Sequence, residues 1–262
     1  MIAAIVQARM GSTRLPDKTL MDIAGKPMLA RLVERARRIP RVERVIIATT
    51  EKPGNRPILQ FAAERGLPAY TGNEKSEEDV LDRVYQTARA YGVSVIVRVS
   101  PDCPLMDPSV SGRVLLRFLE AQGTLDYASN TQPPTFPDGL DTEVFSFDAL
   151  ARAWREAKQG SDREHVTPYI WKHRDEFRLD NVTHNPDLSA LRWTVDTEAD
   201  LEFVCAVYER LGTAAETAGM DEILDLLRRH PELEAINRGV ARNEGYTKSA
   251  RADRAVAAER KT

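Results

Sequence analysis

Short apolar runs alternate with an amphipathic stretch in the N-terminal part of the chain. Residues 2–6 and 45–49 are almost continuously apolar or β-branched, which is typical of strands buried on both faces of a parallel sheet. Between these runs, residues 28–39 carry an apolar stripe at helical spacing. A strand, a helix and a second strand in this order predict a right-handed parallel unit.

Further elements follow at regular intervals. The strongest strand signal is residues 93–99, which are rich in β-branched side chains and bounded by Gly92 and Pro101. Weaker patterns predict strands at 68–72, 126–130 and 191–195, a turn at 23–28, and helices at 58–65, 110–121, 149–157, 202–210 and 220–229. From Lys248 onward the chain is charged and alanine-rich without a full apolar stripe, so we expect it to be frayed or disordered.

The first apolar run leads into a loop dense in polar and cationic side chains. This loop contains Gln7, Arg9, Ser12, Thr13, Arg14 and Lys18. Open α/β sheets bind ligands at the carboxyl ends of their strands. Fixed cations together with hydroxyl groups suit a polyanion. The pattern therefore predicts a triphosphate site, and a solvated basic turn is the alternative.

Two aspartates lie where predicted strands end. Asp102 follows the strongest strand and stands between two prolines, and Asp196 follows residues 191–195. Carboxylate oxygens are preferred ligands of Mg²⁺. Two strands that each end in an aspartate fit a metal held between them. The alternative is that Asp196 or Thr197 caps the next helix.

Two more segments gather functional groups. Asp141 and Glu143 would share one face of a strand, and close carboxylates need a cation, a sugar or water to offset their repulsion. A solvated edge strand is the alternative. His165 lies in a second such segment, although a lone histidine is more often structural. There, Ser161 and Glu164 have the spacing of a helix capping box.

The functional segments read ARMGSTRLPDK, PDCPL, FPDGLDTEVF, SDREHVTPYI and VDTEAD in chain order. They resemble signature segments of the sugar cytidylyltransferases, which include the 3-deoxy-manno-octulosonate and acylneuraminate enzymes, and are most similar to the spore-coat polysaccharide type. The resemblance implies an α/β protein with a three-layer α/β/α nucleotidyltransferase fold and a mostly parallel sheet. We expect one domain over residues 1–246 and a flexible tail over 247–262. The family usually has glycine where this chain has Asp17 and Pro101.

The same resemblance implies transfer of CMP from CTP to an acidic ulosonic or nonulosonic sugar, with release of pyrophosphate, for surface polysaccharide or glycan biosynthesis. From the matching segments, the resemblance implies that Arg9, Lys18, Asp102 and Asp196 are catalytic and that the two aspartates bind Mg²⁺. The nucleotide-binding residues are Gln7, Ala8, Arg9, Gly11, Ser12, Thr13, Arg14, Lys18, Asp79, Arg83 and Asp102. The acceptor-binding residues are Asp141, Glu143, Arg163 and His165. A homodimer is also implied, with the proline-rich residues 131–137 as a candidate contact.

Composition limits the kinds of binding partner and the cellular compartment that we expect for this protein. The 262 residues carry a formal net charge of −3, which provides no bulk attraction to nucleic acid or to an anionic membrane. Two distant cysteines form no disulfide framework and indicate a reducing compartment. The N-terminal residues lack a signal-peptide pattern, and no apolar run approaches the ~20 residues of a membrane span. We therefore expect a cytoplasmic protein.

Three alternatives stay open at this point. The first is the same fold acting on a sugar 1-phosphate or another phosphorylated acceptor, for which Arg163, His165 and Arg192 are candidate ligands. The second is a glycosyltransferase, but no Asp-x-Asp motif stands at a fitting strand end. The third is a non-catalytic sugar-nucleotide-binding protein. The two aspartates and the loop cations argue against it, because such a protein needs no metal.

Overall fold

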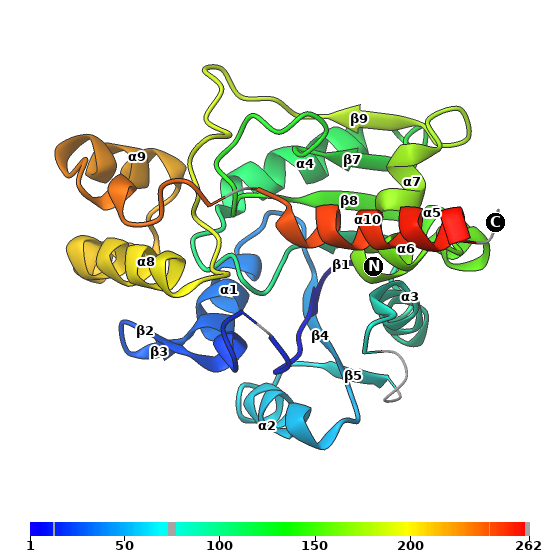
Figure 1. The fold of residues 1–262 in the computed structure, drawn as a ribbon, viewed down its shortest axis with the longest axis horizontal. Helices are drawn as coiled ribbons and strands as arrows, with labels where there is room; N and C mark the ends of the chain where they lie inside the picture. The colour runs from blue at the N-terminus through cyan, green and yellow to red at the C-terminus, as the bar shows by residue number, and fades with distance from the viewer. Residues whose placement is uncertain (13, 73–76, 241, 260–262) are drawn as a thin grey trace.

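The protein is built around a seven-stranded sheet (Figure 1) with the strand order β5-β4-β1-β6-β8-β7-β9. The computed structural model describes residues 1–12, 14–72, 77–240 and 242–259. The strands are β1 (Ile2–Gln7), β4 (Arg44–Thr50), β5 (Ala69–Gly72), β6 (Val95–Arg98), β7 (Tyr127–Ser129), β8 (Glu143–Ser146) and β9 (Leu179–Asn181). Within this sheet, β8 is antiparallel to β6 and β7, and the other pairs of neighbouring strands are parallel. The prediction of a mostly parallel α/β sheet is confirmed.

The middle of the sheet is buried on both faces, which explains its continuous apolar runs. β1 lies between β4 and β6, with Ile5 paired to Ile46 on one side and to Arg98 on the other. Residues 3–6 of β1 are fully buried. After β1, the strands β4 and β5 are added on one side of it, and β6 is then added on its other side. Open α/β sheets bind ligands at such a point, where the strand order reverses.

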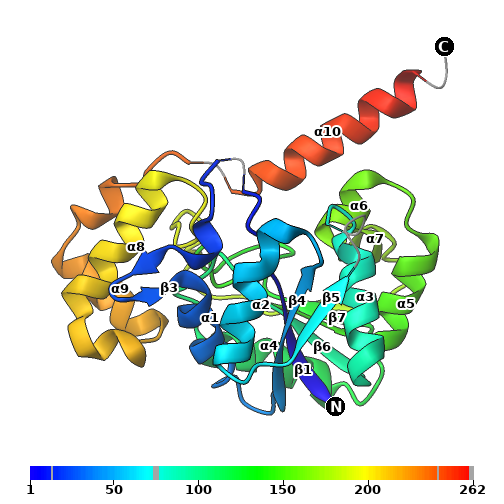
Figure 2. The same ribbon diagram turned by 90° about the horizontal axis from the view of Figure 1, so that it is seen from below.

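Helices cover both faces of the sheet and form the two outer layers. One face packs against α1 (Met28–Ala36), α2 (Arg56–Glu64) and α4 (Pro108–Glu120). The other packs against α3 (Val80–Tyr91), α5 (Phe147–Glu156) and α7 (Pro168–Lys172), and α6 (Gly160–His165) packs against α3 and α7. Figure 2 shows α1 and α2 on one side of the strands and α3 and α5 on the other. The three-layer prediction is therefore confirmed.

A third apolar cluster lies beside the sheet. It joins α8 (Glu198–Leu211) and α9 (Met220–Arg229) to a small hairpin of β2 (Asp22–Ile23) and β3 (Lys26–Pro27). The hairpin occupies the segment for which the sequence predicts a simple turn. Short 3₁₀ helices complete the fold: η1 (Lys18–Leu20), η2 (Pro53–Asn55), η4 (Gly212–Glu216) and η5 (Leu233–Ala235).

The last described element is a long helix, α10 (Glu244–Glu259), where the sequence predicts a frayed or disordered tail. It packs against α6 and lies over the edge of the sheet at which the parallel strands end (Figure 2). The Asp253 carboxylate of α10 accepts hydrogen bonds from the N–H groups of Gly160 (3.0 Å) and Ser161 (2.9 Å). These bonds satisfy the N-terminus of α6, so the predicted Ser161–Glu164 capping box is wrong.

One predicted strand is also wrong. Residues 191–195 form no strand, and a single parallel bridge joins Arg192 to Asp138. The following helix, α8, begins with the predicted cap, because the Thr197 hydroxyl accepts from the N–H of Asp200. Among the described residues, no helix has both the length and the apolar character to cross a membrane.

Candidate active site

The loop after β1 is held at both ends, although it has little regular structure. The N–H of Ala8 donates to the carbonyl of Ala48 on β4 (2.9 Å). The hydroxyl of Thr19, in η1, donates to the carbonyl of Arg9 (2.8 Å). These bonds hold the cationic loop against the carboxyl end of the central strand, as predicted.

The two positions at which the chain departs from the family pattern have clear backbone roles. Asp17 has left-handed dihedrals, φ 57° and ψ 13°, which glycine adopts without strain and aspartate tolerates better than most residues. Pro101 stands second in a turn closed by a hydrogen bond from Cys103 N–H to the Ser100 carbonyl (3.2 Å). Proline is favoured at that position of a turn. Both substitutions therefore fit their sites.

Backbone contacts bring Asp102 and Asp196 together from distant parts of the chain. The carbonyl of Asp102 accepts from the N–H of Val195 (2.8 Å) and from the hydroxyl of Thr194 (3.1 Å). The segment before α8 is thereby joined to the turn after β6, although no strand forms there. As a result, the carboxylate that follows Val195 lies beside the one that follows β6.

The ammonium group of Lys18 lies between these two carboxylates. Its Nζ donates to Asp102 Oδ2 (2.9 Å), to Asp196 Oδ1 (2.8 Å) and to the carbonyl of Val195 (2.8 Å). Burial by itself would lower the pKa of Lys18, but the two aspartates outweigh burial and raise the pKa. Lys18 is thus a fixed positive charge at the carboxyl ends of β1 and β6.

A second cation of the loop, Arg14, joins this group to the C-terminal helix. Arg14 Nη2 lies 3.0 Å from Asp196 Oδ1, and Arg14 Nη1 lies 2.8 Å from Glu244 Oε2 at the start of α10. Burial would raise the pKa of Asp196, but Lys18, Arg14 and Arg192 outweigh burial and lower the pKa. Asp196 therefore stays ionised at neutral pH.

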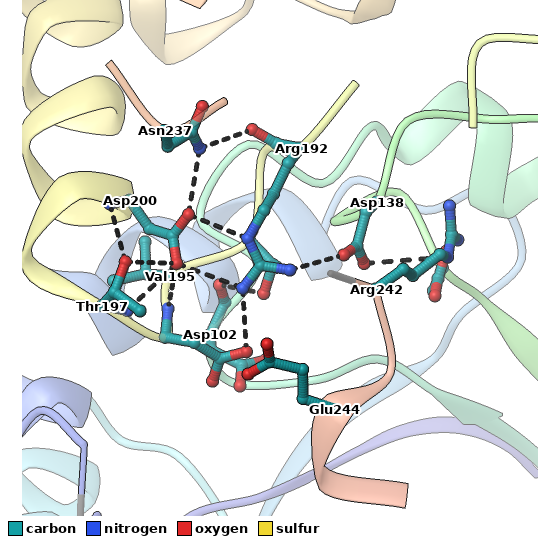
Figure 3. A network of polar contacts seen from close by, with 12 residues as sticks. Asp102, Asp138, Arg192, Val195, Thr197, Asp200, Asn237, Arg242 and Glu244 are labelled. Carbon is teal, nitrogen blue, oxygen red and sulfur yellow. Dashed lines mark hydrogen bonds and ion pairs between the residues drawn. The ribbon is translucent and has the colours of Figure 1, made fainter. Parts of the chain in front are cut away.

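Arg192 anchors the carboxylates behind this group (Figure 3). Its nitrogens donate to Asp200 (2.9 and 3.1 Å), to Asp138 (2.8 Å) and to Asp196 (3.1 Å). Arg242, two residues before Glu244, reaches the other side of Asp138. The side chains of Arg192 and Asp200 are 7% and 0% exposed. This network holds the Asp196 carboxylate from the side opposite Lys18 through Arg192.

On the other side of β1, Arg9 and Arg83 lie close to Glu77. The Arg9 side chain makes no hydrogen bond or ion pair with any residue that the structure describes, whereas Glu77 contacts Lys52 and Asn55. Burial and the nearby Arg9 lower the pKa of Arg83 to about 10. Arg9 is therefore a cation available to an anionic ligand.

The remaining predicted nucleotide contacts lie around this loop. Gln7 ends β1, and its buried Oε1 has no hydrogen-bond partner among the described atoms. Ser12 Oγ accepts from the N–H of Leu15 (3.3 Å), and Gly11 lies close to Glu77. Thr13 lies outside the described residues.

Asp79 and Arg163, predicted on opposite sides of the substrate, pair with each other. Arg163 Nη2 and Nε donate to Asp79 Oδ2 (2.6 and 2.9 Å), and Asp79 Oδ1 caps α3 through the N–H of Asp82 (3.0 Å). Both side chains thus have structural roles that join α3 to α6. Their roles as ligand contacts stay predictions.

Glu143 lies in a polar cluster at the start of β8. Its Oε1 accepts from the hydroxyls of Tyr127 (2.6 Å) and Thr167 (2.6 Å). Its Oε2 pairs with Arg98, which ends the neighbouring strand β6 in register with Glu143. The sequence gives no signal for Arg98 beyond its place at the end of the strongest strand.

Asp141 and His165 both contact the C-terminal segment. Arg242 pairs with Asp141, and burial together with Asp138 and Glu143 raises the pKa of Asp141 to about 7. The ring of His165 meets the ring of Tyr246 edge-on, with 5.4 Å between centroids. The start of α10 therefore forms one wall beside the predicted acceptor residues.

A family model described as cytidylyltransferase matches residues 3–238. The chain belongs to the cytidylyltransferase family. The spore coat polysaccharide biosynthesis protein SpsF of Bacillus subtilis is 31% identical over 238 residues, 88% of this chain and 95% of that protein. The 3-deoxy-manno-octulosonate cytidylyltransferase of Geobacter sulfurreducens is 35% identical over 248 residues, 86% of this chain and 96% of that protein.

The fold agrees with a solved member of the family. A cytidylyltransferase from Leptospira borgpetersenii has a TM-score of 0.85 and 26% identity, and the match covers 92% of this chain and 99% of that chain. The resemblance inferred from the sequence is therefore confirmed, and the family indicates a nucleotidyltransferase enzyme.

The structure groups the predicted residues of this cytidylyltransferase in two neighbouring sets. Lys18, Arg14, Asp102 and Asp196 converge beside β1 and β6, while Asp141, Glu143 and His165 lie toward α6 and α10. The sequence analysis missed Arg98, Arg242 and Glu244, because their surroundings depend on the position of α10 and on the pairing of β6 with β8.

Proposed function

We propose that this protein transfers CMP from CTP to an acidic sugar, a ulosonic or nonulosonic acid, and releases pyrophosphate. The observation that carries the proposal is the convergence of Lys18, Asp102 and Asp196 at the carboxyl ends of two central strands. Cations and carboxylates arranged in this way suit a metal-bound triphosphate. Membership of the family and the two relatives named above support the same reaction.

The donor set fits Mg²⁺. Asp102 and Asp196 hold one cation, Lys18 Nζ, between them at 2.9 and 2.8 Å, so their oxygens already converge on a positive charge. The described residues contain no group of three or more metal-ligating side chains. Mg²⁺ is usually held by one or two carboxylates together with substrate phosphates, so two aspartates are sufficient. A bound Mg²⁺ would neutralise charge on the α-phosphate and lower the pKa of the attacking hydroxyl.

The loop cations supply the charge that the triphosphate requires. Arg9 is free among the described residues, and Arg14 and Lys18 are held by carboxylates that a metal ion could engage instead. We infer that these three side chains bind the β- and γ-phosphates and stabilise the departing pyrophosphate. Such electrostatic stabilisation is the main contribution that proteins make to phosphoryl and nucleotidyl transfer.

In the proposed reaction, the anomeric hydroxyl oxygen of the acceptor bonds to the α-phosphorus while the bond to the bridging oxygen breaks. Asp141, Glu143 and His165 border the side from which the acceptor would approach. Holding the acceptor and the nucleotide in line makes the attack effectively unimolecular. We further propose that the protein acts in the cytoplasm as a homodimer, in a pathway that makes surface polysaccharide.

A phosphorylated acceptor is less well supported. Two of the cations proposed to bind its phosphate are already engaged, Arg163 by Asp79 and Arg192 by three aspartates. The acceptor side also contains the carboxyl groups of Asp141 and Glu143, so a phosphate dianion would be less favourable there than a single carboxylate. This arrangement favours an acceptor that carries one negative charge and several hydroxyls.

The proposal is tested by measuring pyrophosphate release with Mg²⁺. CTP, UTP, GTP and ATP are crossed against ulosonic acids, nonulosonic acids and sugar 1-phosphates. We expect turnover with CTP and at least one of the acids, and loss of turnover in EDTA. Turnover only with a sugar 1-phosphate would contradict the proposed acceptor. CTP binding without turnover on any acceptor would favour a non-catalytic binding protein.

A further inference from the structure

Arg98 is a partly buried arginine whose donors are mostly unused. It is the last residue of β6, and its side chain is 14% exposed. Within the described part of the chain, its guanidinium forms one side-chain interaction, the ion pair of Nη1 with Glu143. The Nε atom is buried and has no hydrogen-bond partner. A guanidinium has five N–H donors, so most of its hydrogen-bonding capacity is not met by this pair.

A buried arginine of the same chain, Arg35, gives a fully paired case for comparison. Arg35 uses all three of its nitrogens, which donate to the carbonyls of Met106, Ala215 and Ala218 and to the Tyr208 hydroxyl. Its bonds hold α1 to the neighbouring segments, as expected of a structural arginine. Leaving buried polar groups unpaired is unfavourable, and more so for a charged group. The open donors of Arg98 therefore call for a ligand.

Glu143 fixes the direction of this guanidinium. Its carboxylate is satisfied by the hydroxyls of Tyr127 and Thr167 in addition to Arg98. These partners come from β7 and from the start of α7, so the carboxylate is held from both sides. Glu143 thus orients Arg98 without saturating it, which is the arrangement expected around a preorganised binding residue.

The location of Arg98 matches the acceptor side of the proposed reaction. The chain runs from Arg98 into the turn that carries Asp102, and its charge acts on His165 of α6. The ring of Tyr246 of α10 also lies edge-on to the ring of His165. Arg98 therefore lies near Glu143 and His165, on the strand that leads to Asp102, and not in the loop that would bind the triphosphate.

We propose that Arg98 binds the carboxylate of the acidic acceptor sugar and makes the enzyme selective for acids. Arginine suits this role because its planar donors match a carboxylate. Nη2 forms no hydrogen bond among the described residues, so it is the donor expected to meet the ligand first. Nε is covered by protein atoms, and a small rotation of the guanidinium is needed before it can join. This inference rests on the proposed function.

The test compares an acid acceptor with the same sugar converted to its carboxamide. In Arg98→Lys we expect KM for the acid to rise about 10- to 100-fold, the size expected for a lost charge-assisted contact. KM for the carboxamide should stay within about threefold, so the preference for the acid collapses. The Kd of CTP should not change, because Arg98 lies away from the triphosphate. As a matched control, Arg178→Lys alters an exposed arginine–aspartate pair and should leave both KM values as they are.

A second variant provides a test that does not depend on the folding of Arg98→Lys. The double variant Arg98→Gln/Glu143→Gln removes both charges of the pair, so that neither charge is left without its partner. This double variant should show the same loss of preference for the acid over the carboxamide. If wild-type enzyme turns over an acid and either variant is folded but keeps the acid preference, the role of Arg98 is wrong and the proposed function stands. A rise in the Kd of CTP without loss of preference would also overturn it. If wild-type enzyme uses no acid at all, both proposals fail.

Discussion

Replacing Arg192 with methionine should destabilise the protein strongly. The change keeps an apolar side chain of similar length and removes the guanidinium that donates to Asp200, Asp138 and Asp196. Asp200 is fully buried, and Arg192 is the main group that lowers its pKa against the opposing effect of burial. Removing one partner of a buried ion pair costs about 3–5 kcal/mol, because a charge is left without its counterpart. At about 2–4 °C per kcal/mol, Tm should fall by roughly 6–20 °C.

Thermal and urea unfolding measure this loss, with Arg228→Met as the control. Arg228 pairs with Asp225 in an exposed setting, so its replacement should change stability by no more than about 0.5 kcal/mol. Adding Asp200→Asn to Arg192→Met should recover part of the loss, since it removes the stranded charge. The lowered pKa of Asp200 stabilises the fold above its unfolded pKa, so the difference between wild type and variant should shrink below about pH 4. A loss under about 1 kcal/mol at pH 7 would refute this reasoning.

Further predictions concern Glu244 at the start of α10, Asp141 beside Arg242, and Asp17 in the loop after β1. Glu244→Gln should lower the Kd of CTP by about two- to fivefold, measured by calorimetry. The reason is that Glu244 pairs with Arg14 in an exposed setting and competes with the phosphates of CTP for this arginine. An unchanged or higher Kd would contradict this. The pKa of Asp141 is raised to about 7, so this group makes the free energy of unfolding fall as pH rises from about 4 to 7. Asp141→Asn should therefore make the pH dependence of the free energy of unfolding less steep, by at most about 1.4 kcal/mol per pH unit, as measured by a series of Tm values. An unaltered slope would argue against a raised pKa. Asp17→Val should cost about 1–2 kcal/mol in urea unfolding, because φ is 57°, whereas Asp17→Gly should change stability little; equal effects would show that the backbone is not strained.

The sequence predicts the sheet well because its strands are buried on both faces. The runs at β1, β4 and β6 are apolar for this reason, and the loop and aspartates that follow them are found at the strand ends. The sequence predicts a strand in the segment before Asp196, but the structure has no strand there. Its apolar residues, such as Trp193, pack into the cluster around α8 instead of a sheet neighbour.

The C-terminal region could not be predicted in the same way. α10 lacks a full apolar stripe, so periodicity gives no sign of it. It is held by polar and aromatic contacts, in which Asp253 caps α6, Glu244 pairs with Arg14 and Tyr246 packs on His165. Such contacts depend on where distant segments lie. For the same reason Arg98 gave no signal, because its partner Glu143 comes from a strand that pairs with β6 in antiparallel register.

The most direct measurement is pyrophosphate release by wild type, Asp102→Asn and Asp196→Asn with CTP, Mg²⁺ and an acidic sugar. Both substitutions preserve size and remove one carboxylate charge beside Lys18. The account predicts wild-type turnover that falls at least about 10²-fold in each variant, which corresponds to ~2.7 kcal/mol or more of lost transition-state stabilisation. Folding should be retained, as judged by Tm. Turnover close to wild type in either folded variant would contradict the claim that these two aspartates form the reaction centre.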